Sequence, residues 1–315
     1  MPTKILITGA TGAVASRLTA HILALPSPPS LRLSTRNKAA FTPPTTTSSP
    51  IEVVQADLTD PTTYATLFAP SPDDPHQTPI SHVFLYAPLT PVPSLDGLLT
   101  FAKDAGVQHI VLLSSFGVEY LPGSLFEKHH SAYENAIQAS GVRYTILRPG
   151  SFMSNAKAFF VPFVKTQEGY QKSDEETLKL PLPHPDMLAS PIADDDMAAV
   201  ALTAIMSDKL VDEVVDLCGP VILSPRGQVD LINALRAKED KGLKPVEIVT
   251  VSPLEWPATV SKAIPGILAD QLLLWWGKCD GVAEQEGNDS ERITGVKALG
   301  FEEWLELNKE VFLSF

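Results

Sequence analysis

Short apolar runs alternate with helix-length segments through the first half of the chain. Six runs are rich in Ile, Val and Leu, at residues 4–8, 31–35, 51–55, 80–87, 109–115 and 143–147. Runs this apolar are typical of strands covered on both faces, and their alternation with helices favours parallel pairing through crossover connections. The pattern predicts an α/β protein with a doubly wound parallel sheet. Two Pro-rich stretches, 39–50 and 69–79, cannot continue a helix or central strand, so we expect surface loops there.

After about residue 150 the alternation becomes irregular, with a Pro-rich segment and an aromatic one, QLLLWWGK. We therefore expect a nucleotide-binding core over residues 1–150, with 191–223 returning to it. A smaller C-terminal, substrate-covering region is expected from 151–190 and 224–315. Three consecutive acids, residues 194–196, precede an apolar segment and predict the start of a helix.

The first predicted strand runs directly into TGATGAVAS, which places Gly9, Gly12 and Ala15 three residues apart. Gly9 permits a tight turn, and Gly12 lets a pyrophosphate approach the backbone at a helix N-terminus. Ala15 lies where the helix packs closely against the strand. The unit predicts a Rossmann-like core that binds a dinucleotide, with a purely structural turn as the alternative. The contacts expected here are Gly9, Thr11, Gly12, Ala13 and Val14.

The end of the second predicted strand indicates which dinucleotide binds. An NAD enzyme usually offers Asp or Glu to the ribose hydroxyls at this point. The segment reads LRLSTRNKAA, which contains no acid. Arg36 and Lys38, with Asn37 between them, can instead pair a 2′-phosphate through charge-assisted hydrogen bonds. NADP(H) is therefore favoured over NAD(H), and two merely exposed cations are the alternative.

Other candidate contacts follow the later strands, because ligands of open α/β sheets bind at the carboxyl ends of strands. Asp57 is expected to meet the adenine edge, to cap a helix before Pro61, or to do both. The remaining candidates are Leu58, Ala87, Pro88, Ser114 and Ser115.

Composition excludes several classes of partner. The net charge of −13 and the pI of about 4.9 repel nucleic acid and anionic lipid. The N-terminus lacks the longer apolar region of a secretory signal, and the run IPGILADQLLLWW is too short to span a bilayer. The two cysteines, Cys218 and Cys279, suggest neither a disulfide framework nor a metal site. We expect a cytoplasmic monomer or homodimer acting on a small molecule.

Several motifs together resemble the NmrA-like group of atypical short-chain dehydrogenases/reductases over roughly residues 3–218. They are TGATGAVA, TRN, QADLTD, LLSSFGVE and ASGVRYTILRPGSFMSN. Within that group the chain looks most like the fungal reductases of ergot-alkaloid assembly, the festuclavine or agroclavine dehydrogenase type. The resemblance implies a nicotinamide lying along Ser114, Pro149 and Phe152.

Short-chain reductases ordinarily carry a Tyr-x-x-x-Lys pair, in which tyrosine donates the proton. Counting back from ASGVRYTILRPG, the tyrosine position falls on Phe126 and the lysine position on His130. His130 could contact the nicotinamide ribose in place of the lysine, or it could be a buried histidine without a role. Lys128 and His129 are expected at the surface.

A reductase needs no proton donor when its substrate is a cation, so the missing tyrosine favours C=N over C=O chemistry. Glu119 could stabilise such a cation, with Tyr120 beside it; the alternative is a solvated loop carboxylate. We predict an NADP(H)-dependent oxidoreductase that transfers hydride to or from an imine or iminium carbon of an alkaloid-type metabolite. The alternatives are an NADP-bound rearrangement or cyclisation enzyme and a non-catalytic NADP redox sensor.

Overall fold

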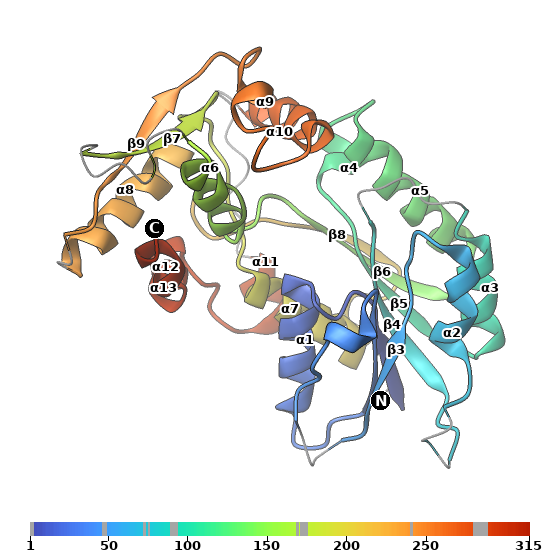
Figure 1. Ribbon diagram of the computed structural model, residues 1–315. Helices are drawn as coiled ribbons and strands as arrows, with labels where there is room; N and C mark the ends of the chain where they lie inside the picture. The colour runs from blue at the N-terminus through green and yellow to red at the C-terminus, as the bar shows by residue number, and fades with distance from the viewer. Residues whose placement is uncertain are drawn as a thin grey trace. The chain divides into compact units, whose positions relative to one another are not determined.

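Figure 1 shows the computed structural model of the protein. It describes residues 3–45, 49–71, 74, 76–88, 94–167, 170, 176–239, 242–279 and 289–315. The chain divides into two compact units. The first comprises Met1–Pro149, Asp194–Leu217 and Ile293–Gly295, and the second comprises Gly150–Ala193, Cys218–Arg292 and Val296–Phe315.

The first unit is built on a seven-stranded sheet in the order β3-β2-β1-β4-β5-β6-β8, and every pair in it is parallel. The prediction of a Rossmann-like, doubly wound sheet is therefore confirmed, and all six predicted strands form. The seventh, β8, was not predicted from its sequence. The strands are β1 Lys4–Ile7, β2 Ser30–Thr35, β3 Ile51–Gln55, β4 Ile80–Tyr86, β5 His109–Leu113, β6 Arg143–Pro149 and β8 Glu213–Leu217.

Helices cover both faces of this sheet: α1 and α7 lie on one side, and α2, α3 and α5 on the other (Figure 1). Helix α7 begins at the first of the three acids, as predicted, and buries a run of small and apolar side chains. The helices of this unit are α1 Ala13–Leu23, η1 Lys38–Ala40, η2 Pro61–Thr63, α2 Tyr64–Phe68, α3 Asp96–Asp104, α4 Gly117–Tyr120, α5 Leu125–Ala139 and α7 Asp194–Met206.

The second unit contains a two-stranded parallel sheet, β7 Leu178–Leu182 and β9 Val246–Thr250. Aromatic side chains fill its core: Trp256 is fully buried and meets Phe163 and Trp276 edge to face, at ring-centroid distances of 5.6 and 5.0 Å. These tryptophans are therefore packing residues. The other elements are η3 Ala156–Phe160, α6 Val161–Lys165, α8 Pro225–Lys238, α9 Trp256–Thr259, α10 Gly266–Cys279, α11 Asp289–Thr294, α12 Phe301–Leu307 and α13 Lys309–Leu313, with Ile293 and Thr294 of α11 belonging to the first unit.

Among the helices that the structure describes, none is long and apolar enough to cross a membrane.

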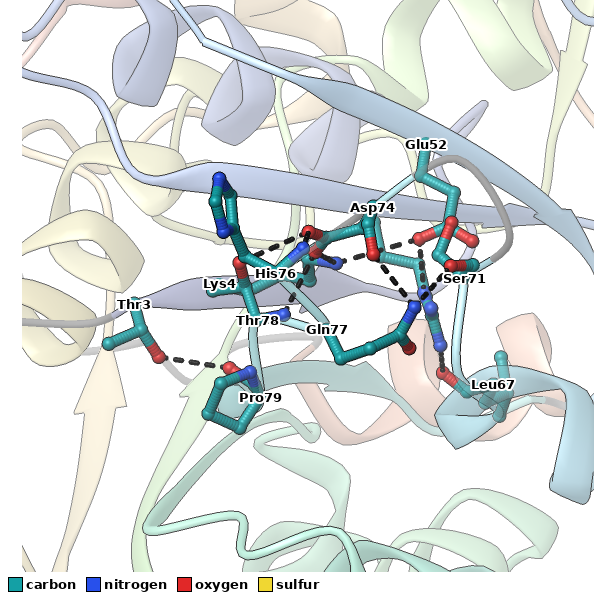
Figure 2. Close-up of polar contacts among 11 residues, drawn as sticks. Thr3, Lys4, Glu52, Leu67, Ser71, Asp74, His76, Gln77, Thr78 and Pro79 are labelled. Carbon is teal, nitrogen blue, oxygen red and sulfur yellow. Dashed lines mark hydrogen bonds and ion pairs between the residues drawn. The ribbon is translucent and has the colours of Figure 1, made fainter.

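The Pro-rich stretch 69–79 is not simply a surface loop. Its Asp74 carboxylate accepts a hydrogen bond from Lys4 Nζ at 2.7 Å, and Lys4 is only 4% exposed (Figure 2). The buried Arg32 beside them donates from Nε to Glu52 at 2.8 Å. A buried cation requires a partner, and Asp74 supplies the carboxylate that pairs with Lys4, so this residue of the loop lies against the sheet. Lys4, Glu52 and Asp74 also line a pocket of about 380 Å³, and these charged groups are already paired with one another or with Arg32.

Candidate cofactor site and neighbouring active site

The glycine turn follows β1 as predicted. Gly9 has a φ of +62°, in the left-handed region that favours glycine. The Gly12 N–H donates to the Gly9 carbonyl at 2.8 Å, and Gly12 then caps the N-terminus of α1 without a side chain. A Cβ atom on Gly12 would lie 3.1 Å from the Gly9 oxygen. The turn thus offers backbone N–H groups at a helix N-terminus that a bulky side chain would obstruct, and these fit a pyrophosphate.

The side chains around this turn divide into two groups. Thr11, Gly12 and Ala13 are exposed at the helix start. Val14 and Ala15 are 5% and 4% exposed and pack into the core. Val14 can therefore reach a phosphate only through its backbone N–H, and Ala15 provides the close packing expected of it.

The candidate 2′-phosphate residues follow β2, where Arg36, Asn37 and Lys38 are all exposed. The Asn37 side chain accepts a hydrogen bond from the Ala40 N–H at 3.2 Å and so caps the short helix η1. This cap uses the Asn37 carbonyl oxygen, so its amide NH2 group can still donate to an anion alongside the Arg36 and Lys38 cations.

Asp57 does not cap the helix before Pro61. Its carboxylate accepts from the Thr59 backbone N–H and hydroxyl, at 2.9 and 2.8 Å, and these bonds, with the charge of Arg36, lower its pKa. The cap is Asp60, which accepts from the Thr62 N–H at 3.0 Å. Asp57 stays half-buried at the end of β3 and faces the charge of Arg36, whereas the adjacent Leu58 is buried in the core.

Ala87 and Pro88 follow β4 and are both buried. The Ala87 N–H donates to the Leu113 carbonyl at 3.3 Å, so the two strand ends are joined there. Ser115 accepts from the Gly117 N–H at 3.1 Å and shapes the turn into α4. Pro149 ends β6, and its carbonyl accepts from the Phe116 N–H at 2.9 Å.

Phe152 belongs to the second unit, where it forms a parallel bridge with Ile192 and is half-buried.

Ser114 lies in a buried polar network that sequence reasoning missed. Its hydroxyl donates to Glu134 Oε1 at 2.5 Å. Glu134 is 4% exposed and pairs with Arg148, whose Nε and Nη2 donate to the two carboxylate oxygens at 2.9 and 2.6 Å. The carboxylate on α5 holds the Ser114 proton, so the Ser114 oxygen can act only as an acceptor toward other groups. An arginine directly after the buried run TIL in the strand RYTILRP was the available signal.

Glu119 lies at the edge of the same network. Its carboxylate is 3.5 Å from Arg148 Nη1, and its side chain is 56% exposed. Asp216 on β8 is 4.0 Å from the same nitrogen. One guanidinium is thus surrounded by three carboxylates, which leaves local negative charge at the ends of β5, β6 and β8. Tyr120 is 40% exposed and stacks on Phe116, with ring centroids 3.9 Å apart.

His130 is buried on α5, at 4% exposure. Its Nδ1–H donates to the Phe126 carbonyl at 2.8 Å, and burial lowers its pKa. A neutral imidazole lacks the positive charge that a lysine at this position would carry. Lys128 is exposed as expected, whereas His129 is half-buried rather than at the surface, since its Nδ1 is covered.

A parallel sheet of this order with a glycine turn after β1 defines a Rossmann-type dinucleotide-binding protein. The chain belongs to the NAD(P)H-binding family, whose model matches residues 9–208. The prediction of a nicotinamide dinucleotide cofactor is therefore confirmed.

Two curated relatives are similar in sequence. The nitrogen metabolite regulation-like protein bik4 of Gibberella fujikuroi is 26% identical over 331 residues, covering 96% of this chain and 95% of that protein. The NAD(P)H azoreductase of Xenophilus azovorans is 28% identical over 197 residues, covering 61% and 63% of the two chains.

Solved structures share the fold. The NADPH-dependent quinone oxidoreductase of Escherichia coli, solved with NADPH, has a TM-score of 0.70 at 20% identity and covers 97% and 99% of the two chains. The triphenylmethane reductase of Citrobacter sp., solved with NADP(H), has a TM-score of 0.67 at 20% identity, with 96% and 99% coverage. The resemblance to NmrA-like short-chain reductases and the prediction of an NAD(P)H-dependent oxidoreductase agree with the family match and with the two curated relatives.

Proposed function

We propose that the protein is an NADP(H)-dependent oxidoreductase that transfers hydride to or from an imine or iminium carbon of an alkaloid-type secondary metabolite, acting in the cytoplasm. One observation carries this proposal. The positions where short-chain reductases hold the tyrosine and lysine are Phe126 and a buried, neutral His130. The usual proton donor and its cationic partner are both absent from these two positions.

Bound NADPH supplies a hydride. Hydride addition to a carbonyl leaves an alkoxide that must be protonated, whereas addition to an iminium carbon gives a neutral amine directly. Ser114 is not suited to supply a proton, because Glu134 already accepts it. The chain's own residues then need only bind and orient the substrate and exclude water.

The charges around Arg148 support a cationic substrate. Glu119 is the most exposed of the three carboxylates beside this guanidinium, with 56% of its side chain accessible. Its role in the proposal is to face the positive charge of an iminium ion. At the adenosine end, Arg36 and Lys38 pair the 2′-phosphate and so select NADP(H) over NAD(H).

The direct test mixes purified protein with NADPH and a panel of cyclic imine and iminium indole alkaloids, following nicotinamide absorbance and product mass together. Loss of absorbance with a product two hydrogens heavier is the expected result. An isomeric product with unchanged absorbance would replace the proposal with a rearrangement or cyclisation.

The similarity to bik4, named as a nitrogen metabolite regulation-like protein, favours a second candidate, a non-catalytic NADP redox sensor. A sensor would bind NADP⁺ and NADPH and consume no hydride with any member of the panel. It would instead change its affinity for a protein partner with the oxidation state of the nucleotide.

A further inference from the structure

Tyr86 lies beside the glycine turn because of the register between β1 and β4. Ile7 pairs with Phe84. Tyr86 follows Phe84 by two residues and Gly9 follows Ile7 by two, so the parallel register places Tyr86 beside Gly9. A Cβ atom on Gly9 would lie 2.5 Å from Tyr86 Cε1 and 2.8 Å from Cδ1. The aromatic ring therefore lies directly against the first glycine of the turn and occupies the space that any larger residue there would need.

Hydrogen bonds hold the backbone of Tyr86 in this place. The Tyr86 N–H donates to the Thr8 hydroxyl at 3.3 Å, and that hydroxyl donates to the Phe84 carbonyl at 3.0 Å. Thr8 is 1% exposed, so this connection between the strand ends is shielded from water. Tyr86 itself is half-buried, which leaves part of its side chain accessible at the carboxyl edge of the sheet.

Arg36, after β2, and Asp57, after β3, are near enough to the Tyr86 phenol for their charges to affect its pKa. The sheet order β3-β2-β1-β4 puts Arg36, Gly9 and Tyr86 at successive strand ends. Burial raises the pKa of the Tyr86 phenol most, while Arg36 lowers it and Asp57 raises it. Because burial raises its pKa, the phenol stays protonated at physiological pH and can donate a hydrogen bond.

We propose that Tyr86 is a further cofactor-binding residue, whose ring packs against the adenosine ribose and whose hydroxyl donates to the 2′-phosphate alongside Arg36. This inference rests on the NADP(H) selection in the proposed function but not on the proposed reaction. A phosphate oxygen accepts well from a phenol, and an adjacent guanidinium holds that oxygen in place. NADH offers the phenol a neutral hydroxyl instead.

The test is cofactor binding measured by calorimetry, with no substrate present. Tyr86→Phe keeps the ring and removes the hydroxyl, so the dissociation constant for NADPH should rise about tenfold while that for NADH stays unchanged. Tyr144→Phe, which changes a half-buried tyrosine on β6, is the matched control and should leave both constants as they are. Circular dichroism verifies that each variant is folded.

Wild-type affinity of Tyr86→Phe for NADPH would overturn the inference, and so would an equal loss for NADPH and NADH. Gly9→Ala gives a second measurement, because the added methyl displaces the ring; unchanged NADPH affinity in that variant would likewise contradict the assignment. A tenfold loss in Tyr86→Phe in a protein that reduces no imine would retain Tyr86 as a binding residue and reject only the proposed reaction.

Discussion

Glu134 on α5 and Arg148 on β6 form a bidentate ion pair, with donor to acceptor distances of 2.9 and 2.6 Å. The carboxylate is buried and also accepts from Ser114. Removing one partner of such a pair leaves a poorly solvated charge behind. The pair therefore affects both the stability of the sheet end and the orientation of the Ser114 hydroxyl.

Glu134→Gln should lower the free energy of unfolding by about 2–3 kcal/mol, because Arg148 then keeps only its longer contacts to Glu119 and Asp216. Urea denaturation measures this change. Gln138→Ala, an exposed position on the same helix, is the control and should cost less than about 0.5 kcal/mol. Equal effects of the two substitutions would mean that the pair does not stabilise the fold.

Glu119→Gln should lower activity while leaving the stability of the fold nearly unchanged. The carboxylate is exposed and 3.5 Å from Arg148, so its removal should change the free energy of unfolding by less than about 1 kcal/mol. The kcat/KM for a cationic iminium substrate should fall about fivefold, since one attractive charge is lost. Glu213→Gln, an exposed change on β8, serves as the comparison. A normal kcat/KM in Glu119→Gln would remove this residue from the active site.

Gly9→Ala tests how far the Tyr86 ring constrains the turn. Gly106 also has a positive φ, +80°, but a Cβ atom there meets nothing within 4 Å. Gly106→Ala should therefore cost only the backbone strain, about 1–2 kcal/mol. Gly9→Ala carries the same strain and a collision with Tyr86 as well, so its midpoint in urea should be the lower of the two. A smaller loss for Gly9→Ala would contradict the packing described here.

Arg36→Ala addresses the choice of nucleotide. Loss of a charge-assisted contact to the 2′-phosphate should weaken NADPH binding about tenfold or more and leave NADH binding nearly unchanged. Titration of both nucleotides into the same preparation gives the ratio. A preference for NADPH that survives this substitution would show that other groups recognise the phosphate.

Two buried histidines that meet edge to face make the sheet sensitive to acid. Burial lowers the pKa of His82 from 6.5 to about 4, and His109, whose ring lies 5.7 Å away, acts in the same direction. The unfolded chain takes up this proton near pH 6.5, whereas the folded chain resists it down to about pH 4. Stability is thus complete above pH 6.5 and falls by about 3 kcal/mol as the pH drops through this window.

His82→Asn should flatten the dependence of unfolding free energy on pH between these limits, and His76→Asn, at an exposed position, should not. An unaltered pH profile in His82→Asn would assign the acid sensitivity to other groups.

Sequence patterns predicted the parts of the fold whose signal lies within a short stretch of the chain. The glycine turn and six apolar strands were predictable because each signal lies within a few residues. Strand β8 was not, because only one of the five residues of the edge strand EVVDL is buried and its sequence carries two acids. Glu134 and Arg148 come from different elements, so only folding brings them together, as it does Asp74 and Lys4, which are 70 positions apart. Asp57 and Asp60 both precede a helix start, and only the backbone path decides which one caps it.

The first unit is assembled from segments that leave the ribosome at different times. When Pro149 emerges, six strands of the sheet exist, but α7, with its buried apolar face, and β8 are still to be made. The face that α1 covers lacks its second helix until residues 150–206 have been synthesised. We therefore expect an expressed fragment that stops at Pro149 to aggregate, and nascent chains of that length to require a chaperone.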